Sequence, residues 1–322
     1  MNCKVSVIMS CYNEKIEWLK ESIESILNQT YKNIEFIIVL DNPKRLDIIE
    51  LVNEYKFNDN RIIFKVNDTN IGLVRSLNKG IEISCGEFIA RMDADDISTS
   101  DRIEKQINFM YNNNDIDLVG TKIRAIDEKG EVISKRSNLL KDPNKIAKLL
   151  PKTNFFNHPT WFAKRKVYIT LNGYREISRN EDYDFLLRAL SYGFKLSNIN
   201  EYLLSYRIRN NGISLSNPLE QYIATLYTKR LYEERKKQKK YLDSYKIENC
   251  NKFICELCTY NEQKRYNKSI ELFNKGIYSF KKYKFFASIR DIIQSIFISK
   301  YGFLRLRELI YYKIYMILLS IF

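Results

Sequence analysis

The chain has 322 residues, of which 45% are hydrophobic and 29% are charged, and its formal net charge is +14 at pH 7. That hydrophobic share supports a packed core and excludes a chain that is disordered throughout. The length allows one large domain with an appendage. The first residues lead into an apolar run without a signal segment, so we expect a cytoplasmic protein with reduced cysteines.

The positive charge is concentrated in the carboxyl-terminal third. Residues 1–218 contain 32 Lys and Arg against 29 Asp and Glu, a balance of +3, whereas residues 219–322 contain 21 against 10, a balance of +11. Strand patterns also stop near Leu219, and the remaining sequence is helical, lysine-rich and aromatic. We therefore predict a first domain at 1–218 and a helical region at 219–322. Such a basic segment favours an acidic partner, either membrane phospholipid or nucleic acid.

Short apolar runs alternate with helical patterns over the first hundred residues. They predict strands at 5–9, 34–40, 61–66 and 87–92, and helices at about 16–28, 46–55 and 73–84. This alternation indicates right-handed βαβ units around a mostly parallel sheet, so the predicted fold class is α/β. Farther along, the patterns predict helices at 101–112 and 181–191, strands at 116–119, 123–126 and 132–134, and a strand entry at 158–162.

Three carboxylates follow the fourth predicted strand in the segment Arg91-Met92-Asp93-Ala94-Asp95-Asp96. Ligands of open α/β sheets bind at this edge, where strands end. Crowded acids repel one another unless a cation or hydrogen-bond donors compensate them. Mg²⁺ and Mn²⁺ prefer one or two carboxylates together with substrate phosphates. The alternative is an ordinary turn that caps a helix, and an isolated Asp-x-Asp does not decide between the two.

The cysteines near the carboxyl terminus raise the question of a zinc site. Cys255-x-x-Cys258 lies close to Cys250, but no second cysteine pair exists and the single histidine, His158, is distant in sequence. We therefore interpret these thiols as packing residues of a helix rather than as zinc ligands.

Several motifs occur together in one order along the chain. They occupy residues 5–14, 25–31, 70–73, 78–80, 86–96, 158–160, 172–174 and 181–184. With them the chain resembles the inverting glycosyltransferases of family 2, which have the GT-A fold, and among these the bacterial enzymes that assemble capsular polysaccharide, exopolysaccharide or lipopolysaccharide. The resemblance covers about residues 3–215. It implies transfer of a sugar from a nucleotide-sugar, here a UDP-sugar, to an acceptor hydroxyl, with Mn²⁺ or Mg²⁺ as cofactor.

The resemblance assigns donor-side roles to the acidic segment. Asp95 matches the metal ligand of the family's Asp-x-Asp motif. Asp93 should hold the ribose or sugar of the donor, or meet the metal through water. Asp96 is either a supporting contact or a helix cap.

Other donor contacts follow from the same resemblance. Asp41 matches the position that binds the nucleotide base, although Leu40 replaces the first of the family's two adjacent acids. Ser10 and Tyr12 match the loop that lies against the nucleotide, where Tyr12 either stacks on the base or belongs to the core. Arg75 is either a donor contact or a solvated arginine on a helix.

Asp182 matches the second acid of the family's Glu-Asp pair and is our choice as general base, with Glu181 tuning its pKa. Both acids would also suit a helix amino terminus without any catalytic role. His158 should be structural or contact the acceptor, and a role as base stays open. Arg207 is either a lid over the diphosphate, on a loop that extends to Ser214, or a surface residue, and Arg209 stands where family members often have histidine.

The last twenty residues, 303–322, have an uncharged run too short to cross a bilayer, so we expect a helix that lies in the membrane interface. The partners we expect are a nucleotide-sugar, a saccharide or lipid-linked saccharide acceptor and the inner face of the cytoplasmic membrane, without nucleic acid. Packing of that helix on the first domain or on a second subunit is the alternative. A sugar nucleotidyltransferase and a non-catalytic scaffold are the alternative functions. The sequence does not specify an oligomeric state.

Overall fold

The computed structural model describes residues 3–135, 139–209, 217–238 and 241–321. The chain divides into two compact units. The first contains residues 1–148, 155–176 and 188–210, and the second contains residues 149–154, 177–187 and 211–322. We describe each unit by itself, and the predicted boundary between residues 218 and 219 stays a prediction.

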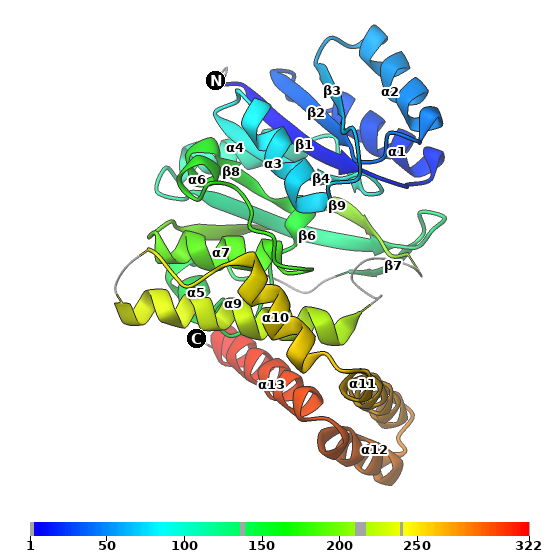
Figure 1. Cartoon of the computed structure of the whole chain (residues 1–322), viewed down its shortest axis with the longest axis vertical. Helices are drawn as coiled ribbons and strands as arrows, with labels where there is room; N and C mark the ends of the chain where they lie inside the picture. The colour runs from blue at the N-terminus through cyan, green and yellow to red at the C-terminus, as the bar shows by residue number, and fades with distance from the viewer. Residues whose placement is uncertain (1–2, 136–138, 210–216, 239–240, 322) are drawn as a thin grey trace. The chain divides into compact units, whose positions relative to one another are not determined.

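The first unit is built on a nine-stranded sheet in the order β3-β2-β1-β4-β8-β6-β9-β5, with β7 paired to β6 (Figure 1). Its strands are β1 Val5–Cys11, β2 Ile34–Leu40, β3 Ile62–Val66, β4 Phe88–Asp93, β5 Ile97–Ser98, β6 Leu118–Ile126, β7 Val132–Lys135, β8 Phe162–Lys164 and β9 Leu196–Arg207. Strands β3, β2, β1 and β4 are parallel, as are β6 and β9, and β8 runs antiparallel between β4 and β6. Most paired residues are therefore in parallel register, and the predicted α/β class is confirmed.

Helices cover both faces of the parallel half of this sheet. The helices of the first unit are α1 Ile16–Leu27, α2 Leu46–Asn58, α3 Leu73–Ile83, α4 Arg102–Asn112 and α6 Arg165–Thr170, while α5 Pro143–Leu149 and α7 Glu181–Ser191 extend across the unit boundaries. Apolar residues of α1, α2 and α4 join one core cluster with Val5, Val7 and Met9 of β1. On the opposite face, α3 approaches β1 so closely at Gly80 that an added Cβ would lie 2.6 Å from Cγ2 of Ile8.

Two expectations about strands are wrong in detail. The segment predicted as two strands is the single strand β6, because pairing with β9 continues past Thr121 and Lys122 through an irregular register. Residues 158–160 form a 3₁₀ turn, η1 His158–Thr160, and β8 follows it. The hydroxyl of Thr160 donates to the carbonyl of Asn157 (2.7 Å), which stabilises the turn.

The second unit contains helices joined by short connections. They are α9 Pro218–Gln238, α10 Ile247–Leu257, α11 Tyr260–Lys281, α12 Phe285–Ile298 and α13 Lys300–Ile321. Leu219, Ile223, Leu231 and Tyr266 form its core together with the buried thiol of Cys250. Within the described residues, no helix is both long and apolar enough to cross a membrane.

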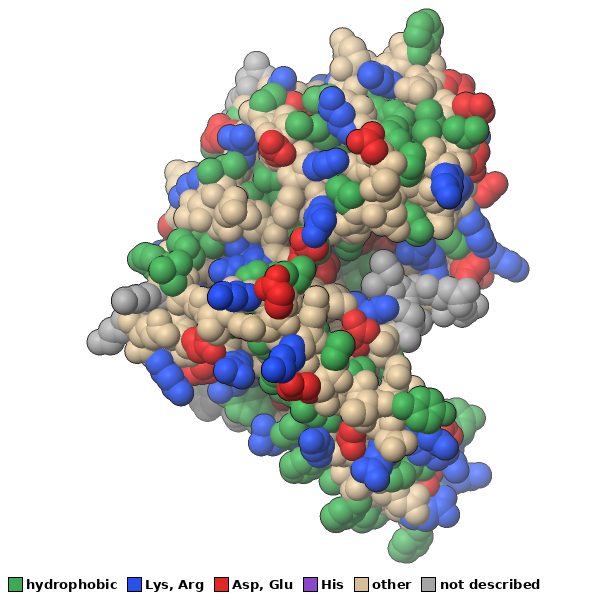
Figure 2. Space-filling model, viewed as in Figure 1, with side chains coloured by type: hydrophobic (Ala, Val, Ile, Leu, Met, Phe, Trp, Pro, Cys, Tyr) green, Lys and Arg blue, Asp and Glu red, His purple; other side chains and the backbone are tan. Residues whose placement is uncertain are grey.

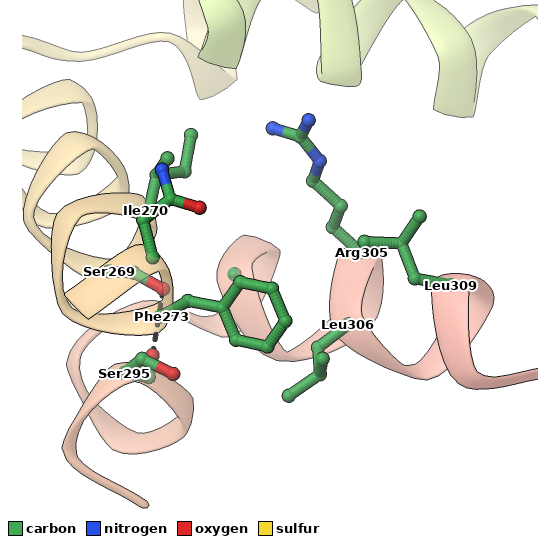
Figure 3. A pocket seen from close by; sticks show the side chains of 9 residues that line it. Ser269, Ile270, Phe273, Ser295, Arg305, Leu306 and Leu309 are labelled. Atoms are coloured by element: carbon green, nitrogen blue, oxygen red, sulfur yellow. Dashed lines mark hydrogen bonds between the residues drawn. The ribbon is translucent and has the colours of Figure 1, made fainter. Parts of the chain in front are cut away.

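A cavity of about 150 Å³ lies among α11, α12 and α13 (Figure 3). Apolar side chains of α11 and α13 point into it, and the guanidinium of Arg305 reaches toward α9. Near the cavity, the hydroxyl of Ser269 donates to the carbonyl of Ser295 (2.7 Å), which links α11 to α12.

Candidate functional site

Strand register brings three of the predicted site residues to one edge of the sheet. On β1, Ser10 lies opposite Asp93 of β4. The backbone N–H of Asp41, just beyond β2, donates to the carbonyl of Cys11 (2.8 Å). Ser10, Asp41 and Asp93 therefore share the carboxyl-terminal edge of three parallel strands, where ligands of α/β sheets bind.

The acidic segment turns inward after β4. The side chain of Asp93 is 30% exposed and pairs with the buried guanidinium of Arg91. Asp95 is buried, and its Oδ2 pairs with Nε of Arg209 at 2.8 Å. Asp96 is fully buried; its Oδ1 accepts from the backbone N–H of Arg207 (2.9 Å), while its Oδ2 has no hydrogen-bond partner within the described residues.

This concentration of acids shifts their protonation. Burial, and after it the charge of Asp93, raises the pKa of the Asp95 carboxyl to about 6. Burial, followed by the charges of Asp93 and Asp95, raises the pKa of Asp96 well above its usual value. Negative charge at this turn is therefore incompletely compensated, and a bound cation would be stabilised there.

These residues could hold a divalent ion only if substrate phosphates and water completed its coordination. In the described ranges, no group of three or more His, Cys, Asp or Glu side chains converges to hold a metal. Mg²⁺ and Mn²⁺ commonly use one or two carboxylates and complete their coordination with substrate phosphates and water. Asp95 and Asp93, with the unpartnered oxygen of Asp96 behind them, suit that kind of site.

Arg207 is the last residue of β9, not part of the following loop where a lid was predicted, and residues 210–214 of that loop lie outside the described residues. Its side chain is 1% exposed. The guanidinium donates to the carbonyls of Asp95 (2.9 Å) and Asp127 (3.2 Å) and to Glu21 (2.5 Å). Arg207 thus fixes the acidic turn to two neighbouring segments, and contact with the donor stays a prediction.

Asp41 is buried and organises the loop that precedes α3. Its carboxylate accepts from Nδ2 of Asn67 (2.8 Å) and from the backbone N–H groups of Ile71 (2.9 Å) and Gly72 (2.8 Å). The backbone φ of Gly72 is +87°, a left-handed conformation that glycine adopts more readily than other residues. A carboxylate has about four acceptor positions, so roughly one remains for a ligand.

Tyr12 and Arg75 are both open to solvent. Tyr12 is 42% exposed, so it does not belong to the core, and its backbone N–H donates to Glu14 (2.7 Å). The Arg75 side chain is 57% exposed and pairs with Glu176 at 2.8 Å. Their predicted contacts with the donor stay predictions.

His158 is held between aromatic rings. Its Nε2 lies 2.8 Å from the hydroxyl of Tyr174, and its ring packs against Trp161 at 4.5 Å between centroids. Burial, and after it the nearby Arg91, lowers the pKa of His158 well below its usual value. These contacts favour the structural role.

Asp182 and Glu181 open α7 and belong to the second unit. Oδ1 of Asp182 accepts from the backbone N–H of Tyr183 (2.6 Å), and Oδ2 accepts from Nδ2 of Asn154 (3.2 Å). Glu181 is buried. The predicted convergence of Asp182 with the acids of the first unit stays a prediction.

Sequence reasoning missed the buried Arg91 as a site residue and named Arg209 without a partner. A signal for Arg91 was present, since a cation between Ala90 and Met92 on a buried strand must find a counter-charge. Arg209 had no comparable signal, because its partner Asp95 is distant along the chain.

An α/β sheet with a buried acidic turn at its carboxyl edge is the kind of fold that binds ligands at that edge, and comparisons with known proteins identify its family. Residues 6–171 match the model of glycosyl transferase family 2. An uncharacterized glycosyltransferase of Methanocaldococcus jannaschii is 41% identical over 72% of this chain and 80% of its own length. The O-antigen biosynthesis glycosyltransferase WbnJ of Escherichia coli is 38% identical over 72% of this chain and 90% of its own. The chain belongs to glycosyl transferase family 2 and is a glycosyltransferase.

Solved structures confirm the GT-A fold. TarS 1-349 of S. aureus in complex with UDP-GlcNAc is similar with a TM-score of 0.59 and 16% identity, over 91% of this chain and 81% of that one. The mannosyltransferase PcManGT of Pyrobaculum calidifontis, in complex with GDP-Man and Mn²⁺, is similar with a TM-score of 0.56 and 14% identity, over 70% of this chain and 64% of that one. These findings do not favour a scaffold or a nucleotidyltransferase.

Proposed function

We propose that this glycosyltransferase moves a sugar from a UDP-sugar to a hydroxyl of a saccharide or lipid-linked saccharide, with inversion, during assembly of a bacterial surface polysaccharide. The observation that carries the proposal is the buried acidic turn beside Ser10 at the carboxyl edge of the sheet. Its relatives include a named O-antigen enzyme, and a structural neighbour binds UDP-GlcNAc. Work on a lipid-linked acceptor implies peripheral contact with the inner face of the cytoplasmic membrane.

Asp95 is the residue that would hold Mn²⁺ or Mg²⁺, and Asp93 would hold the ribose or sugar of the donor or meet the cation through water. When bound, the cation supplies Lewis-acid stabilisation of the departing diphosphate. Arg91 orients Asp93, while Arg207 fixes the backbone of Asp95. Oδ2 of Asp95 pairs with Nε of Arg209, so Arg209 would compete with a cation for that oxygen.

The nucleotide is bound by the loops that follow β1 and β2. The exposed ring of Tyr12 is available to stack on the base. The carboxylate of Asp41 accepts three hydrogen bonds within the protein, so about one of its four acceptor positions is left for an N–H group of the base. The backbone at Ser10 lies next to Asp93, so it borders the donor.

Asp182 acts as the general base. Inversion requires a carboxylate that removes the proton of the acceptor hydroxyl while that oxygen attacks C1 of the sugar. The backbone N–H of Tyr183 and the amide of Asn154 hold Asp182 in place, and Glu181 precedes it at the start of α7.

The test is release of nucleoside diphosphate from a panel of UDP-sugars and GDP-sugars in the presence of Mn²⁺ and a lipid-linked acceptor pool. Asp182→Asn should lower turnover by about 10²-fold to 10⁴-fold and leave UDP-dependent thermal stabilisation unchanged. Asp115→Asn, at an exposed acid paired with Lys195, is the matched control. Full activity of Asp182→Asn would refute its role, and GDP-sugars as better donors would refute the choice of nucleotide.

A further inference from the structure

Helix α12 buries small or polar side chains and exposes several large apolar ones, which is the reverse of an ordinary amphipathic helix. Its buried side chains are the small or polar Ser288, Asp291 and Ser295. Four of its large apolar side chains face solvent: Phe286 is 94%, Ile289 57%, Ile293 48% and Phe297 84% exposed, while Ile292, Ile296 and Ile298 are half-buried. Their spacing of three or four residues places them on one face of the helix.

The opposite face of α12 packs against α11, which explains why the apolar stripe cannot turn inward. A Cβ added at Gly276 of α11 would lie 2.7 Å from Ile292, so the two helices are in close contact there. Asp291 pairs with Arg290 at 2.9 Å and with Lys275 of α11 at 3.8 Å. These contacts fix the rotation of α12 and leave the stripe uncovered within the described part of the chain.

Aromatic rings at the end of α11, in the following turn and at the start of α12 are also exposed. Tyr278, Phe280, Tyr283 and Phe285 are between 50% and 82% exposed. Phe285 contacts Phe280 and Tyr283, with centroid distances of 5.5 and 6.4 Å. We call these four rings together with the stripe of α12 the apolar face.

The charges around the apolar face have one sign. Exposed basic side chains occur along the same segment at Lys275, Lys281, Lys282, Lys284, Arg290 and Lys300, of which Lys275 and Arg290 pair with Asp291. Between residues 272 and 307 the sequence has a single acid, Asp291, and it is 1% exposed and ion-paired. Apolar and basic side chains are neighbours on the visible side of α11 and α12 (Figure 2).

We propose that the apolar face docks on a bilayer that contains anionic phospholipid. This inference rests on the membrane contact of the proposed function and assigns it to α12 and the α11–α12 turn, rather than to the terminal segment 303–322. Phe and Ile side chains enter the acyl boundary, while the surrounding lysines meet the phosphate headgroups. A patch of this kind is unusual on the free surface of a soluble monomer.

The positive border favours lipid over a second copy of the chain. In a symmetric dimer, the same patch would face itself and bring the lysines of both copies together. Unpaired like charges would then oppose association, whereas anionic headgroups compensate them.

Within the second unit, residues of the terminal helix are placed differently. Leu306 and Leu309 of α13 line the cavity shared with α11 and α12 (Figure 3). Leu309 is still 38% exposed, and the exposed apolar residues Phe303, Ile310, Tyr311 and Ile314 of α13 reach at most 52%, against 94% for Phe286 and 84% for Phe297 of α12.

The experiment measures sedimentation of the full-length protein with phosphatidylcholine vesicles that contain or lack phosphatidylglycerol. Wild type should bind the anionic vesicles more strongly. The double variant Phe286→Ser with Phe297→Ser should bind at least about tenfold less, since two exposed aromatic side chains no longer insert. Phe57→Ser, at a 91% exposed phenylalanine of the first unit, should bind as wild type does.

Both substituted phenylalanines are largely exposed, so circular dichroism melting should match that of wild type. Vesicle binding by the double variant equal to that of wild type would overturn the inference. So would a wild-type dimer in sedimentation velocity that the double variant converts to monomer, because a second copy would then cover the face. Binding is measured without donor, so Asp182→Asn should bind vesicles normally even if its catalytic role is refuted.

Discussion

Replacing Asp95 by asparagine should stabilise the protein in the absence of metal while removing the proposed cation ligand. Asparagine has the shape of the protonated acid but carries no charge. The pKa of Asp95 rises from the ordinary 3.8 to about 6 because the carboxyl is buried beside Asp93. That difference corresponds to about 3 kcal/mol of unfavourable free energy for the charged native form well above pH 6. We therefore expect Asp95→Asn to raise the free energy of unfolding by about 2–3 kcal/mol at pH 8.

The pH dependence fixes the sign of this effect. Because the native pKa is above the unfolded one, the carboxyl destabilises the fold only where it is ionised, and its contribution is harmless below about pH 4. The gain from Asp95→Asn should therefore vanish at pH 4 and grow as the pH rises through 6.

Tryptophan fluorescence during urea unfolding with a chelator present is a suitable assay. Both tryptophans of the chain, Trp18 and Trp161, lie in the first unit, so the signal reports the unit that contains Asp95. The control is Asp115→Asn, because Lys195 holds the pKa of Asp115 below its usual value and the expected change is a small loss at pH 8. A less stable Asp95→Asn protein at pH 8, or an equal gain at both pH values, would refute the reasoning.

Two further predictions concern neighbours of this turn. Arg209→Gln should tighten Mn²⁺ binding about threefold to tenfold, because the cation no longer competes with a partly exposed ion pair for Asp95. Calorimetry without donor measures this affinity, with Arg75→Gln as the control. Unchanged or weaker binding would show that Arg209 does not compete. Asp41→Asn should lower the free energy of unfolding by about 2–4 kcal/mol in the fluorescence assay. The amide NH₂ of asparagine would then face the backbone N–H of Ile71 or Gly72, to which it cannot hydrogen-bond. Unchanged stability would mean that the loop at residues 70–72 does not depend on Asp41.

The edge of the sheet where the acids gather could be predicted because it depends on local patterns. Apolar runs define β1, β2 and β4, and parallel pairing then brings Ser10, Asp41 and Asp93 to one edge. The ion pair between Arg209 and Asp95 could not be predicted, because it joins residues that are remote in sequence and depends on the course of β9.

The apolar face shows a second reason why sequence reasoning is incomplete. The periodicity of α12 predicts an apolar stripe but does not say whether the stripe faces the core. The close approach at Gly276 and the buried Asp291 decide this, and both are properties of packing against α11. Segment 303–322 had the more obvious composition, yet Phe286 and Phe297 of α12 are more exposed than any large apolar residue of that segment whose side chain the structure describes.

Arg207 has a consequence for the redesign of this enzyme. One side chain joins Glu21 of α1, the carbonyl of Asp95 and the carbonyl of Asp127, which follows β6. These contacts make the acidic turn rigid, so residues elsewhere around the site can be exchanged without moving the turn. Libraries that seek a new acceptor should therefore keep Arg207 and Glu21 fixed. Substitutions at those two positions would disturb the acidic turn, which is needed whichever acceptor is used.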